Sequence, residues 1–297
     1  MANTREYLLY SDATMSNPNG DMINDNRPRQ DERTYQLEMS DVRIKRYVRD
    51  ELDARGEKVF VKPTKNEKGL FIDCKGVAAK VSKEEGLSKD DAKKGKLEEK
   101  LKQEYKDVKL FGAVVTDPKF NIHGPLQIVW SKSVHECDIV FAQGTSVFTG
   151  SKSEAKQGTN WSKYYTPYAL FKTYMVYNDM TAKKQNIDLS EEDLEEFKDV
   201  LISGIRNYKS TSKNQMPRLL VEVIYNKNYI DGELDYIDIN KKKQDLEIRK
   251  IEEFSFDLKL LADYYNRKKD IINKINIYKH SKVELLNLST DFNVLDI

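Results

Sequence analysis

The sequence predicts an α+β fold with a ferredoxin-like, RNA-recognition-type core and long insertions between its elements. The candidate elements follow one another as strand, helix, strand, helix and strand, which is compatible with such a core. The stretches between them are rich in charged and turn-forming residues, so they indicate excursions from that core. A length of 297 residues suggests two units, or one core with a large insertion.

The first strand and the first helix flank a turn-rich loop. Residues 5–11 are rich in Tyr and Leu, which is typical of a strand. The loop NPNGDMINDNRPR, residues 17–29, contains Asn-Pro and Asn-Gly turn signals, so we expect it to have a defined shape. Ser40 is a good N-cap, Ile44, Val48 and Leu52 then recur at four-residue spacing, and Gly56 ends the helix.

The next stretch, residues 57–110, differs from the rest. It is punctuated by Gly and Lys over 62–76, and acidic and basic residues alternate over 82–105. Leu97, Leu101 and Tyr105 give one thin apolar stripe. This pattern predicts an insertion that projects from the core and contains a mixed-charge helix held by one face.

Four further elements complete the core. Leu126–Trp130 is a compact apolar run that predicts a central strand buried on both sides. Residues 190–209 give the clearest helix, with Ser190 as its cap and Leu194, Phe197, Leu201 and Ile205 on one face. Leu219–Tyr225 reads as a second strand buried on both sides. Over 254–260, Phe and Leu alternate with polar residues, as in a strand buried on one side.

Composition restricts the function. Charged residues make up 33% of the chain and hydrophobic residues 39%, but the formal net charge is only +1, so any nucleic-acid site must be local. Cys74 and Cys137 lie far apart, which supports neither a disulfide framework nor a zinc site and is compatible with a reducing cytoplasm. No signal peptide and no membrane-spanning run is recognisable.

Three groups of residues predict a nucleic-acid interface. Between Asn26 and Arg49 the sequence has seven basic and four acidic residues, so a local patch could follow a phosphate backbone. A solvated helix face is the simpler alternative. A second group lies in the aromatic-rich segment 141–178, where rings could stack on bases and lysines could meet phosphates. The third is a loop in the acid-free stretch 200–221, which also exposes Met216.

The aromatic segment has two interpretations. Residues 142–158 contain too much Gly, Ser and Lys for a core and predict an extended hairpin or loop. Tyr168, Phe171 and Tyr174, in contrast, are best interpreted as the apolar face of a short helix after Pro167.

Catalytic patterns are poor. His123, His135 and His280 are isolated, and no nucleotide-binding motif is present, so we predict no catalytic residue, metal or cofactor. Asp21, Asp25 and Asp31 in and after the first loop could hold a hydrated Mg²⁺, but turn capping is the favoured role.

Five motifs in order resemble one known family. They are NPNGD at 17–21 with NRPR at 26–29, SDVRIKRYVR at 40–49, DVKLFGAVV at 107–115, GPLQIVWSKSVH at 124–135 and YTPYALFKTYMVYN at 165–178. Together they resemble the repeated backbone subunit of type I CRISPR Cascade complexes, in the Csd/Csh branch of the RAMP superfamily, with subtype I-B preferred over I-C. The Lys-rich insertion and the long Lys- and Asn-rich C-terminus depart from the Csd members.

The resemblance implies a hand-like fold: a ferredoxin-like palm with a finger insertion and a thumb hairpin. It places the palm in residues 1–56, 123–135 and 166–297, the last with a C-terminal extension. The finger insertion would be 57–122 and the thumb 136–165.

It also implies a non-catalytic scaffold that stacks head to tail along a CRISPR RNA and presents the spacer to target DNA in antiviral defence. Expected partners are CRISPR RNA, target DNA, further copies of the chain, and the cap, large, small and repeat-processing endonuclease subunits, in the cytoplasm and without a membrane. The alternative is a metal-dependent target-RNA endonuclease that uses a first-loop Asp, Asp21 or Asp25, as in type III effector complexes.

The predicted site residues follow from the three groups and the resemblance. The RNA-binding residues are Asn19, Arg27, Arg29, Arg43, Lys45, Arg46, Arg49, Lys152, Lys156, Lys163, Lys209, Lys213, Met216 and Arg218. The thumb wedge is expected at Val147 and Phe148.

Overall fold

A mixed sheet of nine strands forms the centre of the molecule. The computed structural model describes residues 2–149 and 158–297, with the backbone alone for 146–149 and 158–159. The strands run in the order β16-β14-β11-β1-β10-β8-β4, and β7 and β9 also pair with β10. Their bounds are β1 Arg5–Ser16, β4 Glu38–Met39, β7 Leu126–Ile128, β8 Ser131–Ser133, β9 Val140–Thr149, β10 Gly158–Tyr177, β11 Gln215–Tyr225, β14 Ile272–Lys279 and β16 Asn293–Asp296.

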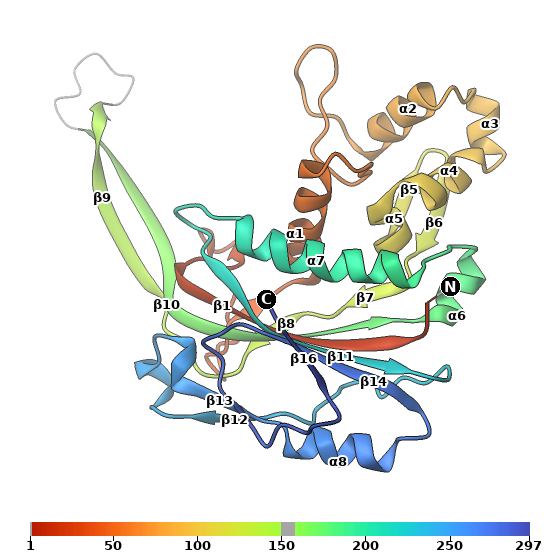
Figure 1. Ribbon diagram of the computed structural model, residues 1–297. Helices are drawn as coiled ribbons and strands as arrows, with labels where there is room; N and C mark the ends of the chain where they lie inside the picture. The colour runs from red at the N-terminus through yellow and green to blue at the C-terminus, as the bar shows by residue number, and fades with distance from the viewer. Residues whose placement is uncertain (1, 150–157) are drawn as a thin grey trace.

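Different parts of the chain cover the two faces of this sheet (Figure 1). Helices α1 (Asp41–Ala54) and α7 (Glu191–Asn207) pack on one face, where Tyr7 and Leu9 of β1 point. Leu8 and Tyr10 point to the other face, toward the small sheet of β12 (Asp238–Lys241), β13 (Phe254–Asp257) and β15 (Leu285–Leu286) and toward helix α8 (Lys259–Arg267). The C-terminal region therefore both widens the main sheet through β14 and β16 and covers its second face.

The stretch between α1 and β7 forms a separate group of elements beside α1 (Figure 1). It contains α2 (Cys74–Glu84), α3 (Lys89–Lys93), α4 (Lys96–Glu104), α5 (Lys106–Phe111), β5 (Gly112–Thr116) and β6 (Lys119–His123). The predicted apolar residues Leu97 and Leu101 are buried in α4. The expected mixed-charge helix held by one face is present as α4, but it covers only part of residues 82–105, because Gly86 and Gly95 have φ of +68° and +92° and separate α2, α3 and α4.

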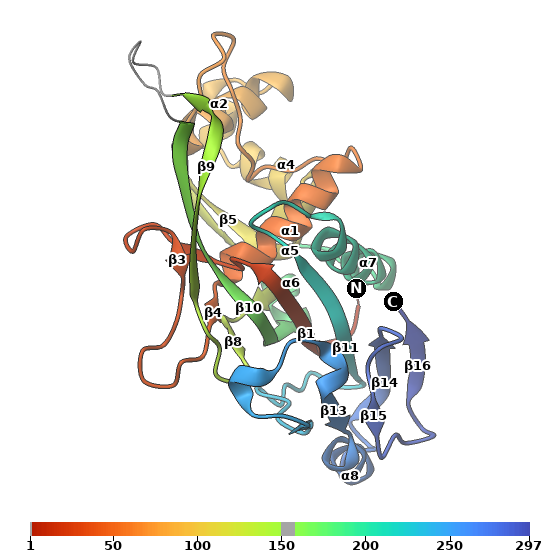
Figure 2. The same ribbon diagram turned by 90° about the vertical axis from the view of Figure 1, so that its left-hand side faces the viewer.

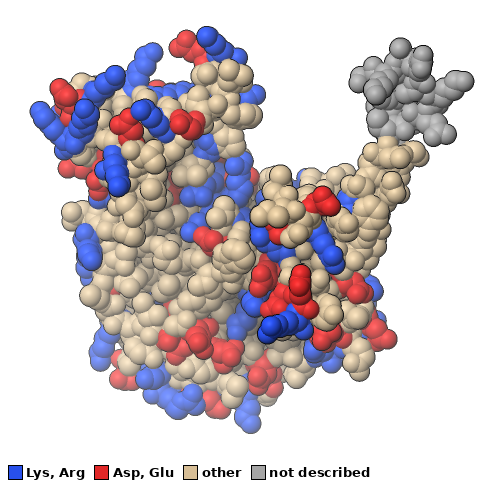
Figure 3. Space-filling model, turned by 180° about the vertical axis from the view of Figure 1, so that it is seen from behind, with Lys and Arg blue, Asp and Glu red and all other residues tan. Residues whose placement is uncertain are grey.

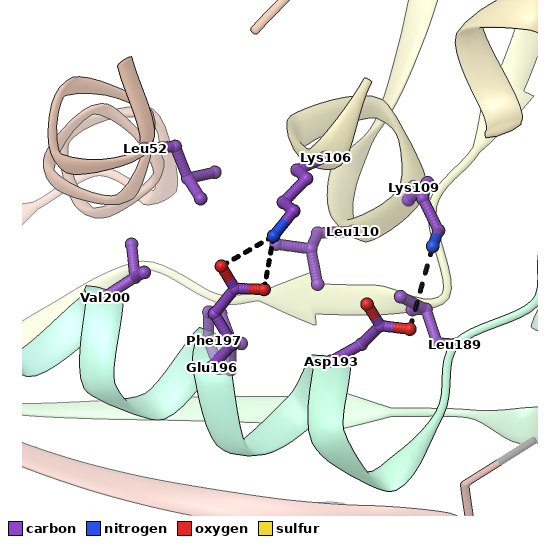
Figure 4. A pocket seen from close by; sticks show the side chains of 9 residues that line it. All are labelled: Leu52, Lys106, Lys109, Leu110, Leu189, Asp193, Glu196, Phe197 and Val200. Carbon is purple, nitrogen blue, oxygen red and sulfur yellow. Dashed lines mark hydrogen bonds and ion pairs between the residues drawn. The ribbon is translucent and has the colours of Figure 1, made fainter. Parts of the chain in front are cut away.

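Helix α5 docks on α7 through a small closed contact (Figure 4). Lys106 Nζ lies 2.6 Å from Glu196, and Lys109 Nζ lies 3.6 Å from Asp193. The cavity beneath them has a volume of about 10 Å³, enough for one water at most. This contact fixes the insertion to the core and offers no room for a ligand.

Several short elements complete the described chain. They are β2 (Gly20–Asp21), β3 (Arg27–Pro28), α6 (Asp179–Gln185), η1 (Asp245–Glu247) and η2 (Ile251–Glu253). Among the described residues, no helix is both long and apolar enough to cross a bilayer.

The predictions with strong local signals are confirmed. Helix α1 begins after Ser40, and α7 begins after Ser190, whose hydroxyl forms a capping box with Asp193. Strands β1 and β11 lie where the sequence predicts them, and Val221, Val223 and Tyr225 belong to the fully buried part of β11.

The helix expected after Pro167 is wrong. Residues 158–177 form one strand, with Tyr168 and Tyr174 packed on one face of the sheet and Phe171 on the other. Eleven residue pairs between β10 and β1 stabilise this strand, and the segment is rich in the aromatic and β-branched residues that favour strands. Long-range pairing therefore outweighs the helix-like spacing of the three rings.

Two strand predictions need correction. The run at Leu126–Trp130 is not buried on both sides: β7 ends at Ile128, Gln127 is exposed, and Trp130 is 51% exposed. The alternation over 254–260 also ends early, because β13 ends at Asp257 and α8 begins at Lys259. In β13, Phe254, Ser255 and Phe256 are all buried, and the ring of Phe256 packs against Tyr10 of β1 with centroids 5.0 Å apart.

Candidate nucleic-acid interface

Four segments that are distant in sequence converge at one corner of the molecule (Figure 2). The amide of Asn17 donates to Ser212 O at 2.8 Å, which joins the first loop to residues 208–214. The hydroxyl of Ser40 donates to Asn19 Oδ1 at 3.2 Å, which joins the first loop to the start of α1. Lys163 Nζ in β10 donates to Thr211 O at 3.4 Å. We call this convergence the cationic corner, and its basic residues are Arg27, Arg43, Lys163, Lys209 and Lys213.

The first loop has a defined shape because its own polar groups hold it. Asn17 Nδ2 donates to Asn26 O at 2.6 Å, and the Asp21 carboxylate accepts from Asn24 Nδ2 at 2.8 Å and from the Ile23 amide at 3.2 Å. These bonds lower the pKa of Asp21 below its ordinary value. A side chain at Gly20 would collide with Asn26 Oδ1 at 1.9 Å.

Two acidic residues of this region, Asp21 and Asp31, act as turn caps. Asp31 accepts from the amides of Arg33 and Thr34, at 2.9 and 3.3 Å, as Asp21 does from Ile23. In the described part of the chain, no group of three or more His, Cys, Asp or Glu is arranged to hold a metal ion. The turn-capping interpretation therefore accounts for Asp21 and Asp31.

Arg43 is the cation of α1 without a carboxylate partner among the described residues. Its guanidinium lies between two rings, with Cζ 4.1 Å from the centroid of Tyr47 and 4.7 Å from that of Tyr208. Its Nε and Nη2 are buried without a hydrogen-bond acceptor. The two rings fix the orientation of a charge that no carboxylate of the described residues neutralises.

Lys213 adds a second charge beside Arg43. Its Nζ donates to Asn17 O and, at 3.3 Å, to Pro18 O, so it also holds the start of the first loop. Burial, together with the positive charge of Arg43, lowers the pKa of Lys213 to about 8. Arg43 and Lys213 are both positively charged and repel each other. A bound anion would reduce that repulsion.

Other polar atoms at this corner also lack partners. Asn17 Oδ1, Tyr47 OH and Gln215 Oε1 are buried without a hydrogen bond, alongside the two nitrogens of Arg43. Unsatisfied buried groups are uncommon in folded proteins and several at one place call for an explanation. Asn17 Oδ1 and Gln215 Oε1 are acceptors, so a donor such as a ribose hydroxyl, and not a phosphate, would be the partner that they lack.

The remaining cations of α1 are each paired with a carboxylate. Lys45 lies 2.9 Å from Asp41, Arg46 2.7 Å from Asp50 and Arg49 3.2 Å from Asp107. The buried Asp107 also accepts the amides of Phe60 at 2.8 Å and Val61 at 3.0 Å. The Arg49–Asp107 pair thereby connects α1 to the segments at residues 60–61 and 107 of the insertion.

A cleft opens between α1 and the insertion. Seen from behind, basic side chains gather where the insertion meets the body (Figure 3). The cleft has a volume of about 520 Å³, and its lining includes Arg46, Arg49 and Lys62. Lys62 is paired with Asp53 at 2.5 Å. This surface is basic in composition, but its charges are largely balanced by neighbouring acids.

Most residues of the third predicted group make contacts within the protein. Arg218 Nε lies 2.7 Å from the buried Asp12, which also accepts the Tyr168 hydroxyl at 3.0 Å. Burial raises the pKa of Asp12 despite the arginine. Lys209 Nζ donates to Gln215 O and to Asn214 Oδ1. Met216 is half-buried in β11, so the expectation that a loop exposes it is wrong.

The predicted residues of the 136–165 segment divide into two sets. Lys163 lies at the cationic corner, and Tyr164 lies beside Arg27, whose Cζ is 6.0 Å from the ring centroid. Lys152 and Lys156 lie outside the described residues. Val147 and Phe148 are in β9, but their side chains are outside the described set.

The sequence did not identify the aromatic clamp on Arg43. Tyr47 lies four residues after Arg43 on α1, a spacing at which helix side chains meet, so this half of the clamp was detectable. Tyr208 comes from the end of α7, and nothing local links it to α1.

Comparison with known proteins gives consistent results. A family model described as "CRISPR-associated protein Cas7" matches residues 3–259. A protein of Haloferax volcanii with the same description is 27% identical, over 95% of this chain and 88% of its own length.

Two solved structures share the fold. A chain of a "CRISPR RNA-guided surveillance complex, pre-nicking" superposes with a TM-score of 0.59 and 14% identity, over 99% of this chain and 96% of that chain. A chain of a "CRISPR RNA-guided surveillance complex" gives a TM-score of 0.52 and 14% identity, over 97% and 95%.

Proposed function

The chain belongs to the CRISPR-associated protein Cas7 family, and from this membership we propose that it is a non-catalytic scaffold subunit that binds CRISPR RNA. Copies stack head to tail along the guide and present its spacer for pairing with target DNA in antiviral defence. The observation that carries the proposal is the cationic corner, where Arg43 and Lys213 have no acidic partner among the described residues.

The corner suits a ribose-phosphate backbone better than base edges. Guanidinium and ammonium groups bind phosphate oxygens strongly, and such contacts carry no sequence information. A subunit repeated along a variable spacer needs contacts of this kind. The net charge of +1 is compatible with repetition, because each copy needs few cations when affinity accumulates along the guide.

We assign a ferredoxin-like palm, a finger insertion and a thumb hairpin to this chain. The strand order β11-β1-β10-β7, with α1 and α7 on one face, supports the palm. The palm comprises residues 1–56, 123–135 and 166–297, the finger 57–122 and the thumb 136–165. The long β9–β10 hairpin supports the thumb.

The proposed RNA-binding set keeps the predicted residues. Arg43, Lys213, Lys163 and Arg27 contribute most, since none of them is paired with a carboxylate in the described part of the chain. The others are Asn19, Arg29, Lys45, Arg46, Arg49, Lys152, Lys156, Lys209, Met216 and Arg218, with Val147 and Phe148 as the thumb wedge. The proposed complex is cytoplasmic, resembles subtype I-B, and includes cap, large and small subunits and a repeat-processing endonuclease.

Nuclease protection of RNA in the purified complex tests the proposal. Protected fragments of spacer length, with unrelated spacers protected equally, are the expected result. Purified chain that carries no RNA and protects none would refute it.

A charge-removal series tests how the guide is held. Replacing Arg27, Arg43 and Lys163 together should weaken retention of unrelated spacers to the same extent. For each phosphate contact removed, the logarithmic salt slope should fall by roughly 0.7. A loss that depends on spacer sequence would contradict backbone binding.

The endonuclease alternative needs its own assay. Incubation of the complex with complementary RNA and Mg²⁺ should leave the RNA intact. Cleavage at regular intervals that disappears in Asp25→Ala would support the alternative.

A further inference from the structure

We propose that the exposed tip of the insertion docks into an apolar groove on the opposite side of the next copy of this chain. The tip is residues 65–71, and the groove lies between residues 129–134 and residues 231–236. The inference rests on the proposed function, because it names two surfaces through which stacked copies contact each other. Its basis is the order of both surfaces, their complementary apolar and charged groups, and their placement on opposite sides of the sheet.

The tip is a small ordered hairpin with two adjacent exposed apolar side chains. Leu70 is 63% exposed and Phe71 is 69% exposed. The side-chain oxygen of Asn66 accepts the amides of Lys68 and Leu70, each at 3.0 Å, and so fixes the turn. Lys65 and Phe71 form a β-bridge at its base. Adjacent apolar side chains held outward by an ordered turn indicate a contact surface.

The tip is also positively charged. Neither Lys65 nor Lys68 is paired with a carboxylate in the described chain, and Lys65 Nζ lies 5.0 Å from the ring centroid of Phe71. Glu67 is the single acidic residue in the sequence 65–71. The tip therefore offers an apolar surface flanked by cations, and its complement is an apolar surface flanked by carboxylates.

The groove is apolar in part and is held in shape by buried hydrogen bonds. Its volume is about 430 Å³, and its lining includes Val129 and Trp130, which are 48% and 51% exposed. The fully buried carboxylate of Glu6 accepts the amides of Asp231 at 2.8 Å and Gly232 at 2.7 Å, which fixes the second wall of the groove. A groove that is already formed costs little ordering when a partner binds.

This second wall is acidic. The sequence 231–238 contains four acidic and no basic residues. Glu233 has no ion pair in the described part of the chain. Asp235 lies 2.6 Å from Lys172, but its side chain is still 72% exposed. These carboxylates would repel a phosphate and attract lysines, so the groove favours a basic protein segment over nucleic acid.

The two surfaces lie on opposite sides of the main sheet, so they can meet only between copies. The loop between α1 and α2, which contains the tip, stands above the sheet in Figure 1, on the side of α1 and α7. Val134 and Tyr174 of the groove pack with the C-terminal region on the other side. Such a contact joins different surfaces of identical chains, and it continues from copy to copy without closing as a two-fold pair.

The contact is too small to hold two free chains together. A tip of residues 65–71 is well below the about 20 to 30 residues that each side of a typical stable interface contributes. Copies bound side by side on one guide have a high effective concentration, which makes a weak contact productive. The contact should therefore appear as cooperative binding to long RNA.

Disulfide formation at chosen positions tests whether tip and groove meet. In a Cys74→Ser background, one preparation carries Phe71→Cys and a second carries Trp130→Cys. Mixed on a single-stranded RNA that holds several copies, the two should form a disulfide-linked pair, and neither preparation should do so alone. A pair formed by Phe71→Cys alone would show a two-fold contact between tips. That result, or the absence of a pair in the mixture, overturns the inference.

Binding to RNA of two lengths measures what the contact contributes. Phe71→Ser and Trp130→Ser should each weaken binding to the long RNA by roughly tenfold, as for an important interface residue, and leave binding to an RNA that holds one copy unchanged. Lys68→Glu should cause a smaller loss that Glu233→Lys in the same chain restores. Lys83→Glu, on the exposed surface of α2, is the matched control and should leave binding to both lengths unchanged.

The outcomes distinguish this inference from the proposed function. Wild-type protein that binds neither RNA refutes the proposed function. Cooperative binding that survives both Phe71→Ser and Trp130→Ser leaves the proposed function intact and refutes the contact between tip and groove. Loss of cooperativity in Trp130→Ser but not in Phe71→Ser would assign the groove to a different protein segment, which also overturns the inference.

Discussion

The two sides of α1 carry similar cations in different surroundings. Toward the cationic corner, Arg43 lies between the rings of Tyr47 and Tyr208 and has no carboxylate partner in the described chain. Toward the insertion, Lys45, Arg46 and Arg49 each contact an aspartate. One helix thus presents both an available charge and charges already neutralised within the protein. Basic composition alone does not identify which cations are available to a ligand.

The difference separates binding from positioning. Arg49 joins α1 to Asp107, which also accepts two amides at the start of the insertion. An arginine in this role shapes the cleft even without touching a ligand. Arg43, in contrast, is held by rings that leave its charge uncompensated.

The largest expected effect is on stability, at the paired side. Asp107→Ala leaves Arg49, the buried amide of Phe60 and the partly buried amide of Val61 without their acceptor, so we expect a loss of about 3 kcal/mol in the free energy of unfolding. Urea denaturation measures it. RNA binding should weaken as well, although a negative charge has been removed. Tighter binding by this variant would mean that Asp107 only keeps Arg49 away from the ligand. The proposed difference between the two sides of α1 would then be wrong.

Arg43→Met should have the largest effect on RNA affinity. Losing one charge-assisted contact of about 2 kcal/mol corresponds to roughly 30-fold weaker binding, measured by fluorescence anisotropy. Arg43→Lys should restore little of it, because an ammonium does not fill a planar slot between two rings. Equal effects from Arg43→Met and Arg46→Met would remove the distinction between the two sides.

Lys213 makes the corner sensitive to alkaline pH. Its pKa is lowered to about 8 in the folded protein, so its burial as an ammonium costs folding free energy below pH 8, and this cost is relieved as pH rises from about 8 to 10.5. A bound phosphate favours the ammonium, so RNA affinity should fall about tenfold between pH 7 and pH 9. Lys213→Arg should show a flat profile in the same titration. A wild-type profile that is equally flat would exclude Lys213 as a phosphate contact.

Arg46→Met should have the smallest effect. Its pair with Asp50 is partly exposed and one helical turn apart, and such pairs contribute less than about 1 kcal/mol. We expect at most a two- to threefold loss of RNA affinity and little change in stability, measured beside Arg43→Met in the same buffers. A loss above tenfold would place the main phosphate contact in the cleft instead.

The sequence predicted those parts of the fold that depend on local signals. Helices α1 and α7 follow from N-cap residues and apolar spacing, and β11 from a compact apolar run. The strand at 158–177 was partly missed, because its pairing with β1 joins residues up to 172 positions apart, as Arg5 with Tyr177. The double coverage of the sheet by the C-terminal region has no local signature either.

The candidate site shows the same division. The cations were recognisable from composition, and the structure brings Arg27, Arg43, Lys163 and Lys213 to one corner. Their availability was not recognisable. Arg49 meets Asp107 58 positions away, and Arg218 meets Asp12 206 positions away. Such partners are fixed only when distant segments fold together, so counting charges along the chain overestimates the number of free cations.

The continuity of β10 has a mechanical consequence. The same uninterrupted strand pairs with β1 in the centre of the sheet and with β9 in the projecting hairpin. The direction of the hairpin is therefore set by the buried centre of the sheet. Identical copies in a stack would hold their β9–β10 hairpins at identical angles. The spacing of these hairpins along the guide would then be set by the sheet, and not by the nucleotide sequence of the guide.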